Sequence, residues 1–135
     1  MNDPHSGTSA RNEKREWVIL VFSSTGFSAM TNNLLESVRR IGLANILVIG
    51  MDKTACEGLR FGEKPAHCIV VEKSVAGGSA LRYKSASYKN LVNSKPCWVR
   101  AAVRLGYDVT FTDSDIVWLR NPYPYFVSRV DSNKQ

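Results

Sequence analysis

Cysteine is scarce in this sequence, and its three cysteines are not spaced as a metal site or a redox pair. Cys56, Cys68 and Cys97 include no Cys-x-x-Cys pair, and an odd number leaves at least one without a disulfide partner. We therefore expect free, buried thiols at these positions. A zinc site would need more ligands than the two histidines, His5 and His67, supply.

Long apolar runs are also missing. No stretch reaches the roughly 18 apolar residues that cross a bilayer, and the N-terminus has no apolar core of the kind found in signal peptides. Residues 1–15 are rich in Asn, Ser, Gly and charged residues, so we expect a disordered lead-in there. The sequence therefore predicts no membrane span within the chain.

Two common nucleotide-binding motifs are absent as well. The Gly and Ser content of residues 72–80 predicts a loop, but this loop contains neither Gly-x-Gly-x-x-Gly nor a Gly-Lys-Ser phosphate loop. Their absence disfavours the dinucleotide-binding and phosphate-loop classes of nucleotide-binding protein.

The basic residues are numerous but scattered. The net charge is +6, and the 18 Lys and Arg residues contain no basic run of five or more. This distribution suits anionic ligands such as diphosphates or acidic glycans, and we expect no nucleic-acid partner.

Four apolar runs of strand length alternate with helical patterns along the 135 residues. Continuous apolar runs are typical of parallel strands that are buried on both faces. Such strands are predicted at residues 17–22, 45–50 and 107–112, with a weaker one at 67–71. The alternation predicts one α/β domain with right-handed connections and a mostly parallel sheet.

Helical patterns occupy two of the connections between these strands. Apolar residues recur at helical spacing over residues 27–41, and residues 87–105 also read as a helix that Pro96 interrupts. Gly42 and Gly106 follow the two patterns as helix stops. A short helical turn is expected at residues 55–59.

A pair of carboxylates follows the fourth predicted strand. Asp113 and Asp115 are separated by one residue and lie between two apolar runs. Carboxylates near a core need a cation or strong donors, and Mg²⁺ or Mn²⁺ prefers oxygen ligands together with substrate phosphates. The alternative is that Asp-Ser-Asp is a polar turn or the cap of a following helix.

The residues around this pair extend the motif. Residues 106–122 read Gly-Tyr-Asp-Val-Thr-Phe-Thr-Asp-Ser-Asp-Ile-Val-Trp-Leu-Arg-Asn-Pro. This stretch resembles the nucleotide-diphospho-sugar transferase family with a GT-A fold, in particular its plant-type α-xylosyl- and arabinosyltransferases. The family pattern is approximately Gly-Tyr-Asp-Val-Leu-Phe-x-Asp-x-Asp-Val-Val-Trp-Leu-Arg-x-Pro.

The resemblance implies an α/β, Rossmann-like GT-A sheet, mostly parallel, with flanking helices. The donor would be a UDP-sugar and the acceptor a glycan or glycoprotein, with transfer that retains the anomeric configuration. It implies Mn²⁺ or Mg²⁺ held directly by Asp115 and by Asp113, which would also contact ribose or sugar hydroxyls. Members of the family are commonly Golgi enzymes.

The implied strand order, 3-2-1-4, brings further residues to the same edge of the sheet. Ligands bind at the carboxyl ends of strands where the order reverses. Ser24 and Thr25 would then face the carboxylate pair across a crevice, with Thr25 and Asp52 near the base and ribose. Lys95 aligns with a family lysine and would neutralise a diphosphate.

Each of these residues has a simpler interpretation. Thr25 can shape a turn, Asp52 can cap a helical turn, and Lys95 can be an ordinary solvated lysine. Trp118 has apolar neighbours and is expected in the core. Arg120 is expected to pair with the Asp-x-Asp motif or to bind phosphate.

The resemblance covers roughly residues 17–126, the nucleotide-binding half of a GT-A domain. We expect a partial transferase domain at residues 16–128 and a tail at 129–135. The acceptor-binding half has no counterpart, and no catalytic residue is identified. The alternatives to a glycosyltransferase are a truncated, non-catalytic nucleotide- or metal-binding module and an α/β interaction protein.

Overall fold

A four-stranded parallel sheet forms the centre of the computed structural model, which describes residues 15–71 and 86–132. Its strand order is β5-β2-β1-β6. The strands are β1 (Trp17–Ser23), β2 (Ile46–Gly50), β5 (Cys68–Val70) and β6 (Asp108–Thr112). This is the predicted α/β order, with the reversal between β1 and β6.

Strand β1 occupies the middle of this sheet. It pairs in parallel with β2 along one edge and with β6 along the other. Its uninterrupted apolar sequence suits a strand covered on both faces, and residues 19–23 are all buried. The remainder of the sheet is therefore assembled on β1.

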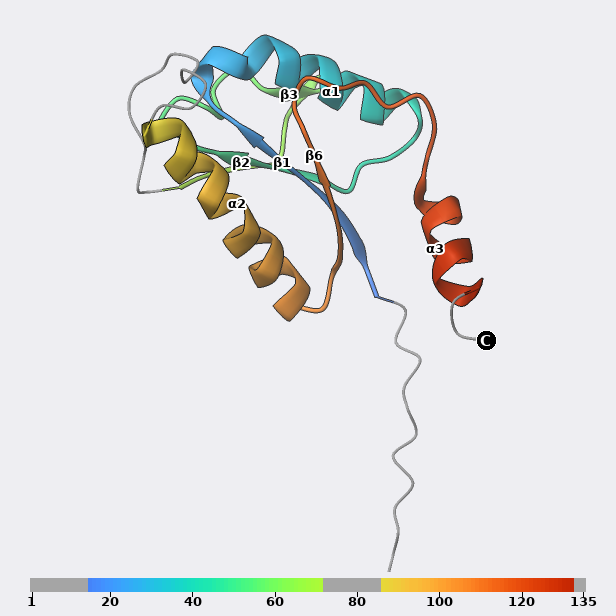
Figure 1. The fold of residues 1–135 in the computed structure, drawn as a ribbon. Helices are drawn as coiled ribbons and strands as arrows, with labels where there is room; N and C mark the ends of the chain where they lie inside the picture. The colour runs from blue at the N-terminus through green and yellow to red at the C-terminus, as the bar shows by residue number, and fades with distance from the viewer. Residues whose placement is uncertain (1–14, 72–85, 133–135) are drawn as a thin grey trace, which may run out of the picture.

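The helices cover both faces of the sheet. A short 3₁₀ turn, η1 (Thr25–Phe27), leads into α1 (Ser28–Arg40), and α2 (Ala86–Arg104) precedes β6. Figure 1 shows α1 above the sheet and α2 below it. The two helices lie on opposite faces because the connections are right-handed and lead to strands on opposite sides of β1.

The core has one part on each face of the sheet. The larger part lies under α1 and contains eight buried residues, which are Ile19, Val21, Leu34, Leu35, Val38, Ile46, Val48 and Leu59. The smaller part contains Phe22, Ile49 and Met51, with Trp98 of α2 packed against it. Leu105, directly after α2, is exposed.

Both predicted glycine stops are confirmed. Gly42 has φ 81° and Gly106 has φ 94°, a left-handed conformation that glycine adopts without the steric cost of a Cβ atom. Pro96 lies inside α2, which continues through it.

Several predicted elements differ in the structure. Residues 55–58 form turns instead of a helical turn. A small antiparallel pair, β3 (Arg60–Phe61) and β4 (Lys64–Pro65), follows them and was not predicted. Helix α3 (Tyr123–Ser132) extends into the stretch where a tail was expected from residue 129.

The expectation that the fourth strand is buried was wrong. Residues 108–111 of β6 are half-buried or exposed, and only Thr112 is buried. The reason is its position, because β6 pairs with β1 and with no second strand among the described residues. An apolar sequence alone does not distinguish an edge strand from a central one.

The expectation of free cysteines was wrong for two of the three. Cys56 and Cys68 form a disulfide with a Cα to Cα distance of 5.6 Å. Cys97 is free, as expected, but it is exposed and not buried. The bond ties the turn after β2 to β5. Parallel pairing of β2 with β5 brings these positions together. The spacing of the cysteines in the sequence does not predict that pairing.

Some predictions fall outside the described residues. The loop at 72–80 is among them, as is the lead-in up to residue 14. Within residues 15–71 and 86–132, no helix has the length and apolar character that crossing a membrane requires.

The disulfide gives a test of the fold. Replacing both partners, with Cys56→Ser and Cys68→Ser, is expected to lower the free energy of unfolding by about 3 kcal/mol, because a closed loop restricts the unfolded chain. Urea unfolding measures the change. Cys97→Ser is the matched control and should leave stability unchanged. A wild-type midpoint that stays the same under dithiothreitol would contradict the disulfide.

Candidate functional site

The carboxyl ends of β2, β1 and β6 meet at one edge of the sheet. Ser23, the last residue of β1, is level with Gly50 at the end of β2, and Thr112 of β6 is level with Val21. The residues that follow these strands are therefore neighbours in space. We refer to this edge, with Ser24, Thr25, Asp52 and the Asp-x-Asp pair, as the carboxyl rim.

Thr25 and Asp52 contact each other directly at the carboxyl rim. The backbone N–H of Thr25 donates to Asp52 Oδ2 at 2.9 Å, and the Thr25 hydroxyl donates to Asp52 Oδ1. The N–H of Thr54 also donates to Oδ1, at 3.1 Å. Asp52 thus fixes the turn after β1 against the turn after β2.

These donors change the acidity of Asp52, which is only 4% exposed. Burial raises the pKa of its carboxyl group, but hydrogen bonds from Thr25 and Thr54 stabilise the anion and outweigh burial. The net result is a pKa below the usual 3.8. Asp52 is therefore a fixed anion at the rim at neutral pH.

Ser24 lies beside this network and is 6% exposed. Its hydroxyl oxygen is buried and has no hydrogen-bond partner among the described residues. The neighbouring Ser23 hydroxyl is instead bonded to the Thr31 hydroxyl of α1 at 2.6 Å. A buried hydroxyl without a partner is unusual in a folded protein.

Lys95 of α2 reaches the end of β6. Its ammonium Nζ lies 3.9 Å from Asp113 Oδ1 and 5.1 Å from the centre of the Phe111 ring. The Phe22 ring, which is next to the Phe111 ring, lies 5.7 Å from the same ammonium group. Two aromatic faces and a carboxylate hold this cation in place, so Lys95 is not an ordinary solvated lysine.

The two carboxylates of the Asp-x-Asp motif face solvent. The Asp113 side chain is 63% exposed, against 27% for Lys95, and Asp115 is also exposed. Neither carboxylate is buried in the core, so neither requires a partner to remain ionised.

This donor set fits a hard divalent cation. Two accessible carboxylates are what Mg²⁺ sites commonly take from a protein when substrate phosphates and water supply the other ligands. No group of three or more His, Cys, Asp or Glu side chains suited to a metal occurs within residues 15–71 and 86–132. A cation bound here would therefore depend on oxygen atoms of its ligand.

Trp118 packs against the larger core, as expected. Its backbone N–H donates to the Ser37 hydroxyl of α1 at 3.0 Å, and its indole N–H donates to the Thr112 hydroxyl at 3.2 Å. These bonds fix the segment after the Asp-x-Asp motif against α1. Arg120 is exposed, and no ion pair of Arg120 occurs in the described part of the chain.

Two contributors to the carboxyl rim were not identified from the sequence. Phe22 and Phe111, 5.6 Å apart, form the apolar support of Lys95. The strand pairing of Leu20 with Phe111 predicts their proximity once the order of β1 and β6 is known. The disulfide, which anchors the turn that carries Asp52, is the second contributor.

The Asp52 network predicts an acid-sensitive stability. Because the pKa of Asp52 is lower in the folded protein than in the unfolded chain, its ionised carboxylate stabilises the fold at pH values above the unfolded-state pKa. This stabilisation is lost as the pH falls through the folded-state pKa. Asp52→Asn should cost about 1 to 3 kcal/mol at neutral pH and should lose less stability than the wild type as pH drops below 3.8. Urea unfolding over a pH series measures both.

Asp108→Asn is the matched control for this test, since its exposed carboxylate contacts Arg15 at 3.7 Å on the same sheet. It should keep the acid sensitivity of the wild type. Equal acid sensitivity in Asp52→Asn and the wild type would show that the Asp52 network does not contribute.

Comparison with known proteins places the chain in a family. Residues 41–134 match the model of the family described as nucleotide-diphospho-sugar transferase. The UDP-D-xylose:L-fucose alpha-1,3-D-xylosyltransferase 3 of Arabidopsis thaliana is 31% identical over 121 residues, which are 88% of this chain and 31% of that protein. No solved structure gives a significant match.

Two further relatives are named for the transfer of other sugars. Arabinosyltransferase XEG113 of Arabidopsis thaliana is 24% identical over 86% of this chain and 18% of its own length. The UDP-galactose:fucoside alpha-3-galactosyltransferase of Dictyostelium discoideum is 32% identical over 47% of this chain and 10% of its own length. The chain spans about a third of the length of the xylosyltransferases that it matches. It belongs to the nucleotide-diphospho-sugar transferase family.

Proposed function

We propose that this chain binds the nucleotide-sugar donor, a UDP-sugar, of a glycosyltransferase reaction. The observation that carries the proposal is the placement of two exposed carboxylates, Asp113 and Asp115, at the end of β6, where the strand order reverses. Ligands of open α/β sheets bind at this position. Membership of a nucleotide-diphospho-sugar transferase family supports a donor of that class.

In this proposal the diphosphate of the donor lies beside the carboxylates and Lys95. Asp115 and Asp113 would hold Mn²⁺ or Mg²⁺, which when bound neutralises charge that develops on the departing diphosphate. Lys95 already lies beside Asp113 and would place a fixed positive charge near the same oxygens. A net charge of +6 favours the approach of an anionic donor.

The nucleoside fits along the ends of β1 and β2. Ser24 offers a hydroxyl without a partner, and Thr25 lies beside it in a turn that Asp52 holds rigid. A rigid turn loses little conformational entropy when a ligand binds. In this proposal the main role of Asp52 is to position Thr25. The remaining acceptor capacity of the Asp52 carboxylate is directed to the ribose or base.

Sugar transfer is the further part of the proposal. Relatives are named as transferases of xylose, arabinose or galactose, several of them acting from a UDP-sugar. We extend this chemistry to a glycan or glycoprotein acceptor, with retention of the anomeric configuration. The Golgi lumen is the proposed compartment, and the Cys56 to Cys68 disulfide supports it, since disulfides persist in oxidising compartments.

A second candidate function is donor binding without transfer. The described residues offer the two carboxylates Asp113 and Asp115 and no group of three or more candidate metal ligands. This small donor set favours a nucleotide- or metal-binding module, which would bind UDP but release no sugar from any UDP-sugar.

A thermal melt tests donor binding. Mn²⁺ and UDP together should raise the unfolding midpoint because a ligand that binds only the folded state stabilises it, by about 2.7 kcal/mol at one hundred times the dissociation constant. Asp115→Asn should abolish this increase. Mn²⁺ alone should have a smaller effect, since two carboxylates supply only part of its coordination shell.

Asp108→Asn is again the matched control, because Asp108 lies at the opposite end of β6 and should leave the ligand-induced increase intact. If Mn²⁺ and UDP leave the unfolding midpoint of the wild type unchanged, the proposal of donor binding is overturned. Binding of UDP without release of sugar from UDP-xylose, UDP-arabinose or UDP-galactose would select the second candidate function.

A further inference from the structure

Residues 113–117, which we call the Asp-x-Asp loop, carry both candidate metal-binding carboxylates. The loop forms neither helix nor strand, and four of its five residues are exposed. No hydrogen bond between backbone groups holds it within the described part of the chain. A segment with so few backbone bonds and so little burial is ordinarily mobile. The course of this loop therefore depends on side chains at its ends.

The two ends of the Asp-x-Asp loop are bonded to each other. Thr112, the last residue of β6, is buried, and its hydroxyl accepts the indole N–H of Trp118 at 3.2 Å. An extended chain between these two residues would span roughly 20 Å. The bond forms because the chain turns back, with the turn at residues 114 and 115. The Trp118 indole therefore closes the loop.

Ser37 of α1 anchors the same end of the loop. Ser37 is 7% exposed, and its hydroxyl donates to the Leu34 carbonyl at 2.7 Å. The oxygen of this hydroxyl also accepts the backbone N–H of Trp118, at 3.0 Å. Its neighbours Leu34, Leu35 and Val38 are buried in the larger core. The closed end of the loop is thus tied to a part of α1 that packing holds in place.

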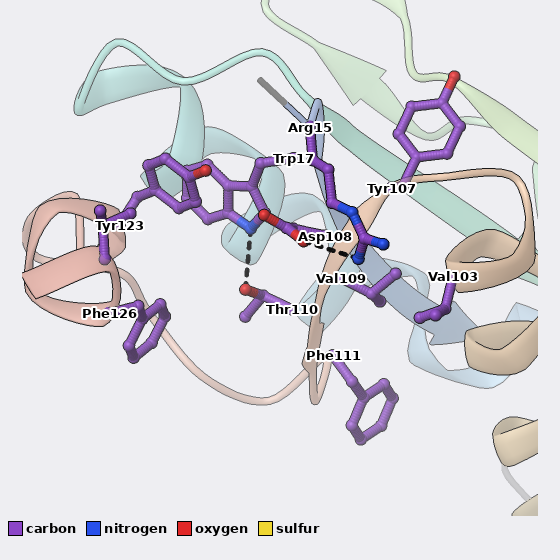
Figure 2. Close-up of a pocket in the computed structure, with 11 residues that line it drawn as sticks. Arg15, Trp17, Val103, Tyr107, Asp108, Val109, Thr110, Phe111, Tyr123 and Phe126 are labelled. Carbon is purple, nitrogen blue, oxygen red and sulfur yellow. Dashed lines mark hydrogen bonds and ion pairs between the residues drawn. The ribbon is translucent and has the colours of Figure 1, made fainter. Parts of the chain in front are cut away.

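The Trp118 ring is also part of an aromatic stack. It lies 6.3 Å from the Trp17 ring, which in turn lies 4.4 Å from the ring of Tyr123. Figure 2 shows Trp17 against Tyr123, and the bond of 2.8 Å that the Trp17 indole N–H donates to the Thr110 hydroxyl. Thr110 and Thr112 share one face of β6, since alternate residues of a strand do so. Ring stacking and hydrogen bonding together fix the orientation of the Trp118 indole.

We propose that Ser37, Thr112 and Trp118 are positioning residues that hold the Asp-x-Asp loop in the shape that metal and donor binding need, a role that rests on the proposed function. Ser37 and Thr112 act through Trp118, and Trp118 acts through the backbone of the loop. A loop that is already closed loses less conformational entropy on binding than one that must first be ordered.

The two hydroxyls favour this role over simple filling of the core. Trp118 packs against the larger core, and a purely packing role would be served by apolar side chains at its neighbours. Burying a hydroxyl costs free energy unless the hydroxyl is hydrogen-bonded. Ser37 and Thr112 are both buried, and both bond to the one residue that closes the loop. Their polarity therefore specifies where Trp118 lies.

The choice of metal gives this role a signature of its own. Mg²⁺ demands near-ideal octahedral geometry with oxygen ligands at about 2.0–2.1 Å, whereas Ca²⁺ accepts longer and more flexible contacts. A loosened loop should therefore weaken Mg²⁺ binding more than Ca²⁺ binding. A general loss of stability lowers the affinity for both ions alike, so the ratio of the two affinities separates positioning from stability.

Backbone dynamics of the ligand-free chain test whether these bonds close the loop. Ser37→Ala removes the acceptor of the Trp118 backbone N–H, and Thr112→Val removes the acceptor of its indole. Both variants should lower the heteronuclear NOE of the loop amides, which reports picosecond to nanosecond motion. Circular dichroism melts establish that each variant folds. Unchanged NOE values in both variants would overturn the proposal, whether or not the chain binds a donor.

Thr110→Val is the matched control. It deletes the acceptor of the Trp17 indole on the same face of β6, but this bond does not join the ends of the Asp-x-Asp loop. The loop amides and the metal affinity of this variant should match those of the wild type. Equal effects of Thr110→Val and Thr112→Val would contradict a specific role for the bond between Thr112 and Trp118.

Manganese binding tests the consequence for the site. The EPR signal of free Mn²⁺, recorded in the presence of UDP, measures the Mn²⁺ affinity of each chain. Ser37→Ala and Thr112→Val should each weaken Mn²⁺ binding by about fivefold. Displacement of Mn²⁺ by Mg²⁺ or Ca²⁺ should show that the variants lose more affinity for Mg²⁺ than for Ca²⁺.

Failure of the positioning role and failure of the proposed function give different results. If the wild type binds Mn²⁺ with UDP and both variants bind it equally well, the positioning role is overturned and donor binding stands. Equal losses of Mg²⁺ and Ca²⁺ affinity would leave the three residues a structural role only. A wild type that binds neither Mn²⁺ nor UDP would overturn the proposed function and the positioning role with it.

Discussion

Every part of the candidate site depends on one constraint, the burial of β1 between two parallel neighbours. The apolar run of β1 can be covered only if β2 and β6 pair with its two edges and helices pack on its two faces. That arrangement brings the turns after β1, β2 and β6 to one edge. Polar residues from three distant parts of the sequence then become neighbours at the point of order reversal between β1 and β6, where open α/β sheets bind their ligands.

The charged residues of the carboxyl rim differ in their solvent exposure. Asp52 is buried, and its anion is held by donors of the protein itself, so it acts as a structural anchor for Thr25. The Asp-x-Asp carboxylates are exposed, and Asp113 contacts Lys95. Lys95 lies beside the Phe22 and Phe111 rings and Asp113, which places a positive charge next to the Asp-x-Asp motif.

The sequence predicted the sheet well because β1, β2 and the two glycine stops depend on local patterns. The period of apolar residues defined α1, and the Asp-x-Asp flanks indicated the strand order through family resemblance. Features that depend on long-range pairing were missed. The disulfide requires the contact of β2 with β5, and the edge position of β6 depends on the absence of a further strand beside it within the described chain. The contacts of Asp52 with Thr25 and of Lys95 with two rings arise in the same way, from strands that are adjacent in space and distant in sequence.

Paramagnetic broadening of amide signals tests most directly whether the carboxyl rim binds a metal and a nucleotide together. Mn²⁺ broadens the signals of nearby nuclei, so the account predicts loss of the Asp113 and Asp115 amide signals when Mn²⁺ and UDP are added together. The amide signals of Thr25 and Asp52 should shift with UDP, while those of Trp17 and Asp108, at the opposite end of the sheet, should persist. Broadening centred elsewhere, or unchanged spectra at saturating Mn²⁺ and UDP, would contradict the account.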